Sequence, residues 1–300
     1  MLSRPFIIAC GPGIKASARS IFRLFSSAAS QSSDRGVTEE RYNDTKRYLD
    51  FHYPLSVLEE NAPMVAGSLI SPQTPQYFHN FYQKYHKEWD NSTALLLEVG
   101  GGPSIYTYVS AVPYVAKIYH ADYLKTNLNE VSMWKSKDPD AFDWSPYFKY
   151  VIRKLESKTN FDAVLEREDK LRGLLHVIPC DIKSDVIVPA VKVPVDILSS
   201  SFCFGTCFDS LEDYKIGLKK VYDMITPNGF FVSQTSLELT WYKFEDKLYH
   251  TSFSLSLEDV ERYYKEIGFD ILHADFWTNP MEVRNIMSDA GGFGFIVARK

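Results

Sequence analysis

The sequence lacks the features that mark several classes of protein. Lysine and arginine number 33 against 38 aspartates and glutamates, and the net charge of −5 gives no support to binding nucleic acid or an anionic membrane. No apolar run approaches the roughly 20 residues of a membrane span. The 300 residues, 45% hydrophobic and 24% charged, therefore predict an ordinary globular protein with one large domain or two small ones.

Cysteine is scarce, with four residues at positions 10, 180, 203 and 207. Cys203 and Cys207 have a spacing that suits two metal ligands, but no second cysteine or histidine pair completes a zinc set. Two interpretations stay open: reduced buried thiols of an intracellular protein, which we favour, and a metal site or disulfide. We therefore predict no bound metal.

Acidic residues are absent before Asp34, whereas basic residues stand at positions 4, 15, 19 and 23. Residues 17–25 can form a short helix with arginines on one side and apolar residues on the other. This is the make-up of a mitochondrial transit peptide, and the apolar run at 6–10 is too short for a secretory signal. Residues 1–33 are expected to be a transit peptide leading to the mitochondrial matrix, or a disordered tail of a cytoplasmic protein.

An apolar run that ends in three glycines is the most informative stretch that is present. Leu95 to Val99 runs into Gly100, Gly101 and Gly102. This predicts a buried parallel strand followed by a turn that comes close to a ligand, because glycine has no Cβ. The following Pro-Ser pair suits the start of a helix whose free N–H groups face that ligand. A tight turn without a ligand is the alternative.

The glycine spacing distinguishes between two nucleotide ligands. The dinucleotide motif G-x-G-x-x-G has three glycines. Gly100 and Gly102 match the first two, but the third has no counterpart, which argues against NAD. An acid, an apolar residue and then G-x-G, as from Glu98 onward, is the pattern of methyltransferases that bind S-adenosylmethionine. Asp122 lies about 20 residues past the glycines at the end of the next predicted strand. It is expected to accept hydrogen bonds from ribose hydroxyls, with a helix N-cap as the alternative.

Strands and helices alternate through most of the chain. Residues 38–90 are predicted to form an N-terminal helical cap over the sheet. Its tyrosines either contact a ligand or pack against other side chains of the protein. Helices are predicted at 103–112, 214–225 and 257–267, and strands at 95–99, 115–121, 174–179, 194–198, 230–234, 269–277 and 292–298. The last two strands have no obvious helix between them. The predicted fold class is α/β: a Rossmann-like, doubly wound seven-stranded sheet with an antiparallel C-terminal edge hairpin.

These stretches resemble a family that contains nicotinamide N-methyltransferase, phenylethanolamine N-methyltransferase and the thioether and indolethylamine methyltransferases. The resemblance is carried by Glu98 to Tyr106, Asp122-Tyr, Asn127-Leu, Asp140-Ala-Phe-Asp-Trp-Ser-Pro146, Cys180-Asp181, Pro227 with Gly229 and Phe230, Trp241-Tyr242, and Phe295 to Lys300. The Asp140–Pro146 motif is the most specific of these. The resemblance covers residues 42–300 and implies one methyltransferase domain over 38–300, with its catalytic core from 94.

The resemblance also implies roles at the matching positions. S-adenosylmethionine is expected to be bound by Tyr48, Tyr53, Gly100, Gly101, Gly102, Tyr106, Asp122, Asn127, Asp181, Ile182 and Ser201. The acceptor is expected to meet Phe202, Thr235, Leu239 and Tyr242, and catalysis to involve Tyr48, Glu238 and Asp289. Thr235 and Leu239 stand where the amine enzymes of the family use an acid, so the acceptor side departs from the family pattern.

The predicted function is that of an S-adenosylmethionine-dependent N-methyltransferase, moving a methyl group to a nitrogen, or a sulfur, of a small molecule. The expected acceptor is an amine or nitrogen heterocycle, and the protein is expected to be a monomer that binds no nucleic acid. Two alternatives stay open. One is a catalytically weak relative that binds the cofactor and acts as an interaction module, which the altered acceptor residues support. The other is a protein methyltransferase.

Overall fold

The computed structural model describes residues 45–54, 58, 73–160, 162–244, 247–279 and 288–300, all within one compact unit, Val37–Lys300. Residues 1–33, with the expected transit peptide, lie outside these ranges, as does much of the expected cap. None of the helices in the described ranges has both the length and the apolar character that crossing a bilayer requires.

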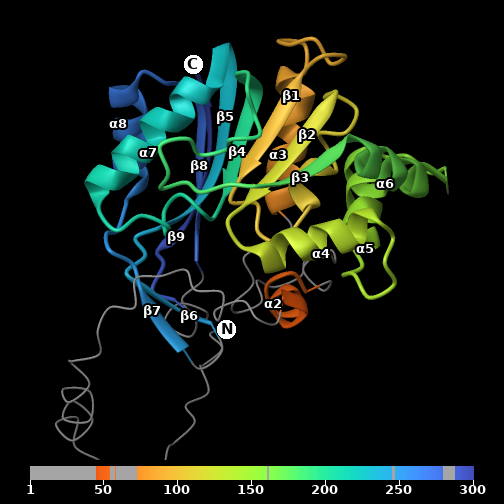
Figure 1. Cartoon of the computed structure of the whole chain (residues 1–300), viewed down its shortest axis with the longest axis horizontal. Helices are drawn as coiled ribbons and strands as arrows, with labels where there is room; N and C mark the ends of the chain where they lie inside the picture. Colours follow the sequence, from red (N-terminus) through yellow and green to blue (C-terminus); the bar gives the residue numbers. More distant parts are fainter. Residues whose placement is uncertain (1–44, 55–57, 59–72, 161, 245–246, 280–287) are drawn as a thin grey trace, which may run out of the picture. The chain divides into compact units, whose positions relative to one another are not determined.

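One seven-stranded sheet organises the structure (Figure 1). Its strands are β1 (Leu95–Val99), β2 (Lys117–Asp122), β3 (Leu175–Pro179), β4 (Val195–Ser201), β5 (Ile225–Leu237), β8 (Asp270–Thr278) and β9 (Gly292–Arg299), in the order β3-β2-β1-β4-β5-β9-β8. The first five are parallel, and β9 runs antiparallel to both β5 and β8. The predicted doubly wound sheet with an antiparallel edge is therefore confirmed.

Helices cover both faces of this sheet. Successive residues of a strand point to opposite faces, and here both faces carry apolar side chains that need to be buried. One buried cluster joins Leu96 and Phe230 to α3 (Gln73–Tyr85), which lies behind the sheet in Figure 1. The other joins Leu97 and Phe231 to α7 (Leu211–Met224) and α8 (Leu257–Ile267) in front. The connection from β2 to β3 holds α4 (Lys125–Lys135), α5 (Ser145–Lys149), the π-helical segment η4 (Tyr150–Leu155) and α6 (Asp162–Leu174).

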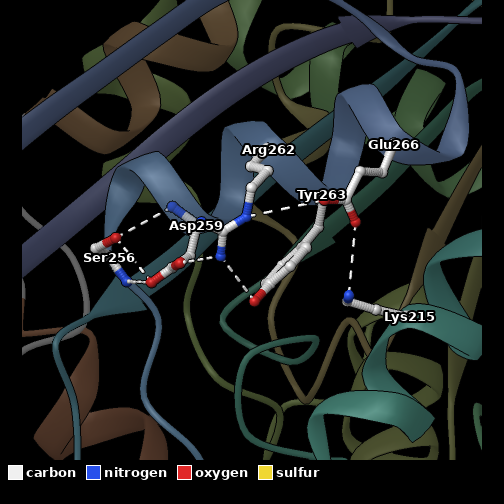
Figure 2. A network of polar contacts seen from close by, with 6 residues as sticks. All are labelled: Lys215, Ser256, Asp259, Arg262, Tyr263 and Glu266. Carbon is white, nitrogen blue, oxygen red and sulfur yellow. Dashed lines mark hydrogen bonds and ion pairs between the residues drawn. The ribbon is translucent and has the colours of Figure 1, made fainter.

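Surface contacts fix α8 and join it to α7 (Figure 2). Ser256 Oγ accepts from the Asp259 N–H, and Asp259 Oδ2 accepts from the Ser256 N–H, both at 3.1 Å, which is a capping box. Arg262 pairs with Asp259 one turn later, and Lys215 of α7 lies 3.5 Å from Glu266. This exposed ion pair adds little to the contact between the two helices, which rests on the packing of Tyr214 against Tyr263.

Two smaller elements lie near the carboxyl ends of the parallel strands (Figure 1). The first is α2 (Thr45–His52), the described beginning of the expected cap. The second is an antiparallel pair, β6 (Trp241–Phe244) and β7 (Lys247–His250), which the sequence did not predict. Strand β5 also begins earlier than predicted, at Ile225 instead of 230.

The helix predicted over residues 103–112 is wrong. Only a single 3-10 turn, η3 (Tyr106–Tyr108), forms in this segment, between irregular turns. Residues 103–112 are all buried, so the segment has no polar face to give to solvent as an amphipathic helix does. The Val109 carbonyl accepts a hydrogen bond from Arg167 Nη1 at 2.7 Å. The inference that a helix N-terminus faces the ligand therefore fails.

Candidate functional site

The glycine turn follows β1 and folds back over β2. The N–H groups of Gly100 and Gly101 both donate to the Ala121 carbonyl, at 2.8 and 3.1 Å. Gly100 (φ 70°) and Gly102 (φ 63°) are in the left-handed region that favours glycine. A Cβ on Gly102 would meet no described atom within 4 Å, so this side of the turn is open to a ligand.

Asp122 holds the turn from the end of β2. Its Oδ2 accepts from the Gly102 N–H at 2.8 Å, and its Oδ1 accepts from the Leu124 N–H at 2.9 Å and from Asn127 Nδ2 at 3.0 Å. Burial raises the pKa of Asp122, and these hydrogen bonds only partly offset the effect. The Tyr123 backbone also interacts with this carboxylate, so a ribose hydroxyl would have to share or replace one of these donors. The N-cap of α4 is Leu124, not Asp122.

Aromatic rings join α2 to the turn. The Tyr53 ring centroid lies 5.7 Å from that of Tyr106 in η3 and 5.4 Å from that of Trp144. Tyr147 of α5 lies 6.3 Å from Tyr106, also between centroids. Trp144 belongs to the Asp140–Pro146 motif, so this motif supports Tyr53, one of the predicted cofactor contacts, and reaches Tyr106 through Tyr147.

The buried polar atoms without a hydrogen-bond partner among the described residues include Asn127 Oδ1, Tyr147 Oη and Gln234 Nε2, which lie around the turn. Gln234 is 1% exposed and accepts from the Tyr106 hydroxyl at 3.0 Å through its other amide atom. Buried polar atoms are normally bonded, so this group suits a polar ligand. Together with the open side of Gly102, it fits the ribose and amino-acid parts of S-adenosylmethionine. Gln234 was missed, although its place on β5 follows from strand alternation.

The predicted adenine residues lie beside the ribose residue. Strand β3 ends next to β2, where the Cys180 N–H donates to the Asp122 carbonyl at 2.9 Å. Asp181 follows, with its Oδ1 accepting from the Lys183 N–H at 2.9 Å, and Ile182 is buried. This order along the edge of the sheet is the one expected for a nucleoside lying across the ends of β2 and β3.

Known proteins identify the family. The NNMT/PNMT/TEMT family matches residues 36–300. The chain belongs to this family. Nicotinamide N-methyltransferase from Sus scrofa is 32% identical over 208 residues, which cover 69% of this chain and 76% of that protein, and the Homo sapiens protein gives the same values. Phenylethanolamine N-methyltransferase from Rattus norvegicus is 28% identical over 214 residues, or 70% and 73% of the two chains.

The fold agrees with this membership. The structure of magnesium protoporphyrin IX methyltransferase from Synechocystis, with bound S-adenosylmethionine, superposes with a TM-score of 0.51 at 8% identity. The match covers 91% of this chain and 99% of that one. As a member of the NNMT/PNMT/TEMT family, the chain is an S-adenosylmethionine-dependent N-methyltransferase.

Glu98, the acid of the family's strand-to-turn pattern, is buried within the fold. Its Oε2 accepts from Ser199 Oγ at 2.5 Å and from Thr107 Oγ1 at 3.3 Å. Burial raises the pKa of Glu98, and the hydroxyl donors lower it in part. Glu98 therefore ties β1 to β4 and to the segment after the turn. Ser201, the predicted cofactor contact, ends β4 opposite Gln234 of β5.

The predicted acceptor residues lie on β5 and after β4. Thr235 is 6% exposed, and a Cβ on Gly205 would lie 2.7 Å from its Oγ1, so the segment after β4 covers it. Leu239 is also buried. Phe202 packs edge-on against Phe293, with centroids 5.7 Å apart. The contacts shown for Thr235 and Phe202 are thus with a glycine, the Ser236 carbonyl and an aromatic ring.

Of the remaining predicted residues, Tyr48 packs against His52 within α2, with ring centroids 4.4 Å apart, and lies 6.4 Å from the Tyr53 ring, also between centroids. Tyr242 stacks on Tyr249 across the β6–β7 pair at 5.5 Å. Glu238 is exposed, with a left-handed backbone (φ 54°), and a Cβ on Gly291 would collide with its carboxylate.

Asp289 is occupied by structural contacts. Its Oδ1 accepts from the N–H groups of Thr240 and Trp241 at 2.8 and 3.0 Å, and its Oδ2 contacts the Thr240 hydroxyl. Burial alone would raise the pKa of Asp289, but these hydrogen bonds outweigh it and lower the pKa. Asp289 therefore fastens the start of β6 to the segment before β9, and its catalytic role stays a prediction.

The described cysteines are free thiols: Cys180, Cys203 and Cys207. Burial, the largest effect, raises the pKa of Cys180, so its thiol stays protonated. Among the described residues, no group of three His, Cys, Asp or Glu side chains could hold a metal ion. Cys203 packs against the turn, because a Cβ on Gly100 would lie 2.2 Å from its Sγ.

Proposed function

We propose that this methyltransferase acts on a neutral nitrogen, or a sulfur, of a small molecule rather than on a cationic amine. The observation that carries the proposal is the surroundings of Thr235 and Leu239, which stand where amine enzymes of the family use an acid. Both are buried, Asp289 is bound by Thr240 and Trp241, and Glu238 is exposed. A desolvated ammonium without a charged partner is costly, so cationic amines should bind poorly here.

The chain's own residues have a limited task in this reaction. The bound cofactor supplies an activated methyl group on a sulfonium, whose departure leaves a neutral thioether. Asp122, Asn127 and Gln234 would hold the cofactor through the polar atoms described above, and Tyr53 with Tyr147 would close over it. Positioning the acceptor and excluding water then provide most of the rate enhancement. A neutral nucleophile needs no general base before it attacks.

The relatives offer two model acceptors for a test. Nicotinamide carries a neutral ring nitrogen, and phenylethanolamine is a cation at neutral pH; each gives its name to a relative of this chain. A labelled-methyl transfer assay should give at least about tenfold higher kcat/KM for neutral heterocycles, a difference of about 1.4 kcal/mol. Efficient methylation of a primary amine by the unmodified protein would contradict the proposal.

Thr235→Asp provides the matched perturbation. It places a carboxylate beside the predicted acceptor position and should raise turnover of phenylethanolamine. Thr235→Asn introduces a side chain of the same shape as aspartate but without the charge, and it should not raise this turnover. No change in either variant would show that the acceptor lies elsewhere. Calorimetry with the demethylated cofactor separates the alternatives: binding without turnover on any small molecule or protein extract would favour an interaction module.

We further propose that residues 1–33 direct the protein to the mitochondrial matrix. The support is the absence of acids before Asp34 and the two arginines, Arg19 and Arg23, on one side of a predicted helix. A fusion of residues 1–33 to a fluorescent protein should reach mitochondria, and the same fusion with Arg19→Glu and Arg23→Glu should not. Diffuse cytosolic fluorescence of the first fusion would refute the idea. The monomeric state stays a prediction, which light scattering can test.

A further inference from the structure

His120 lies beneath the glycine turn. It is the third-last residue of β2, opposite Glu98 of β1, and none of its side chain is exposed. The Tyr108 hydroxyl lies 2.7 Å from its Nδ1, and Tyr108 is itself fully buried. Among the described residues, Nε2 has no partner at hydrogen-bond geometry, and the ring interacts with the Gly102 backbone. The ring is therefore fixed at one end and closely surrounded at the other.

Gly101 lies directly against this ring. A Cβ on Gly101 would be 2.6 Å from His120 Cε1 and 2.8 Å from Nδ1, far inside the normal contact distance of about 3.5–4.0 Å. The φ angles of Gly100 and Gly102 are positive, but Gly101 is not among the positive-φ glycines. Its backbone therefore does not call for glycine, whereas the space taken by His120 does.

Core packing alone does not explain a histidine at this place. A buried imidazole with one unpartnered nitrogen is less favourable than an apolar side chain of similar size. Its neighbours are the parts of the turn that the site uses: the Gly101 N–H bonds to Ala121, and the Gly102 N–H bonds to Asp122. A change in the position of this ring would move both N–H groups.

We propose that His120, held by Tyr108, is a positioning residue that sets the height of the glycine turn and thereby the affinity for the cofactor. The inference rests on the proposed binding of S-adenosylmethionine at this turn. His120 acts through Gly101 and does not touch the ligand. The two residues depend on each other: because an imidazole stands at position 120, the residue at position 101 must lack a Cβ. A side chain at 101 should be tolerated only when His120 is replaced as well.

A double-mutant cycle on the full chain tests this, with the Kd of S-adenosylhomocysteine measured by calorimetry. Gly101→Ala should weaken binding at least about tenfold, because the turn is lifted off the ring. His120→Ala should weaken it less, and adding Gly101→Ala to His120→Ala should cause no more than about a threefold further change. His120→Asn, which keeps a partner for the Tyr108 hydroxyl, should bind better than His120→Ala.

Gly173→Ala in α6 is the matched control, since a Cβ there would meet no described atom within 4 Å. It should leave the Kd unchanged. Normal binding by Gly101→Ala, or an equal loss from Gly101→Ala with and without His120, would overturn the inference. A Gly101→Ala protein that fails to fold supports it only if His120→Ala restores folding and binding; failure of both overturns it. Absence of binding by the unmodified chain would overturn both this inference and the proposed function.

Discussion

Acidification from pH 7 to pH 4 should reduce the folding free energy by about 3 kcal/mol through one side chain, His120. Burial lowers the pKa of His120 from 6.5 to about 4, and contact with the Gly102 backbone opposes this only slightly. The unfolded chain binds a proton near pH 6.5, whereas the folded chain resists it until about pH 4. Between these values the unfolded state binds more protons, so stability falls as the pH falls.

The magnitude follows from the difference between the two pKa values. Each pKa unit corresponds to about 1.4 kcal/mol, and the loss is nearly complete at pH 4. Glu98 and Asp122, whose pKa values burial raises, act in the opposite direction. Asp259 and Asp289, whose pKa values are lowered, act in the same direction as His120. The total pH dependence therefore does not isolate His120, and a matched variant is needed.

His120→Asn supplies this comparison, because it does not titrate and keeps a polar partner for Tyr108. Urea unfolding of both proteins, followed by circular dichroism at pH 7, 6, 5 and 4, gives two stability curves. From pH 7 to pH 4, the unmodified protein should lose about 3 kcal/mol more unfolding free energy than His120→Asn. The other titrating groups are common to both proteins and cancel in this comparison. Parallel curves would show that His120 is protonated as readily in the folded chain as in the unfolded one.

Three further predictions concern the turn and α8. Asp122→Ala should weaken cofactor binding by about 1–3 kcal/mol in calorimetry, because a charged hydrogen-bond acceptor is lost; unchanged affinity would exclude Asp122 from the site. Gly100→Ala should lower thermal stability, because its Cβ would collide with Cys203 at a left-handed φ; Cys203→Ala should recover only part of the loss, since it removes Sγ but keeps Cβ at 2.6 Å. Ser256→Ala should destabilise the protein by about 1 kcal/mol by removing the capping box with Asp259, and its cofactor Kd should equal that of the unmodified chain.

Much of the sheet could be predicted, because its signals are local. The run from Leu95 to Val99 forms β1 as expected, since it is apolar and ends at glycine. The helix at 257–267 and its end at Gly268, with φ 114°, follow from a serine cap, an amphipathic pattern and a terminal glycine. The antiparallel strands at the edge could be inferred because no helical segment separates them.

The failures depend on contacts between distant residues. The segment 103–112 has helix-compatible residues, but it is buried on all sides and Arg167 binds one of its carbonyls. The partners of Asp289, Thr240 and Trp241, stand almost 50 residues away, so these hydrogen bonds could not be predicted from the sequence. At Gly100 the neighbour of an added side chain would be Cys203, which stands about 100 residues away in the sequence. His120 was missed for the same reason.

The position of β9 has a consequence for how the chain is made. This strand, residues 292–299, lies between β5 and β8 and is buried along nearly its whole length. During synthesis, β5 and β8 leave the ribosome before it and cannot pair with each other in the finished arrangement. Both present an open edge to other chains until β9 is inserted between them. A chain that ends shortly before residue 292 would therefore keep five parallel strands with an open edge at β5 and an unpaired β8, and both could pair with a strand from another chain.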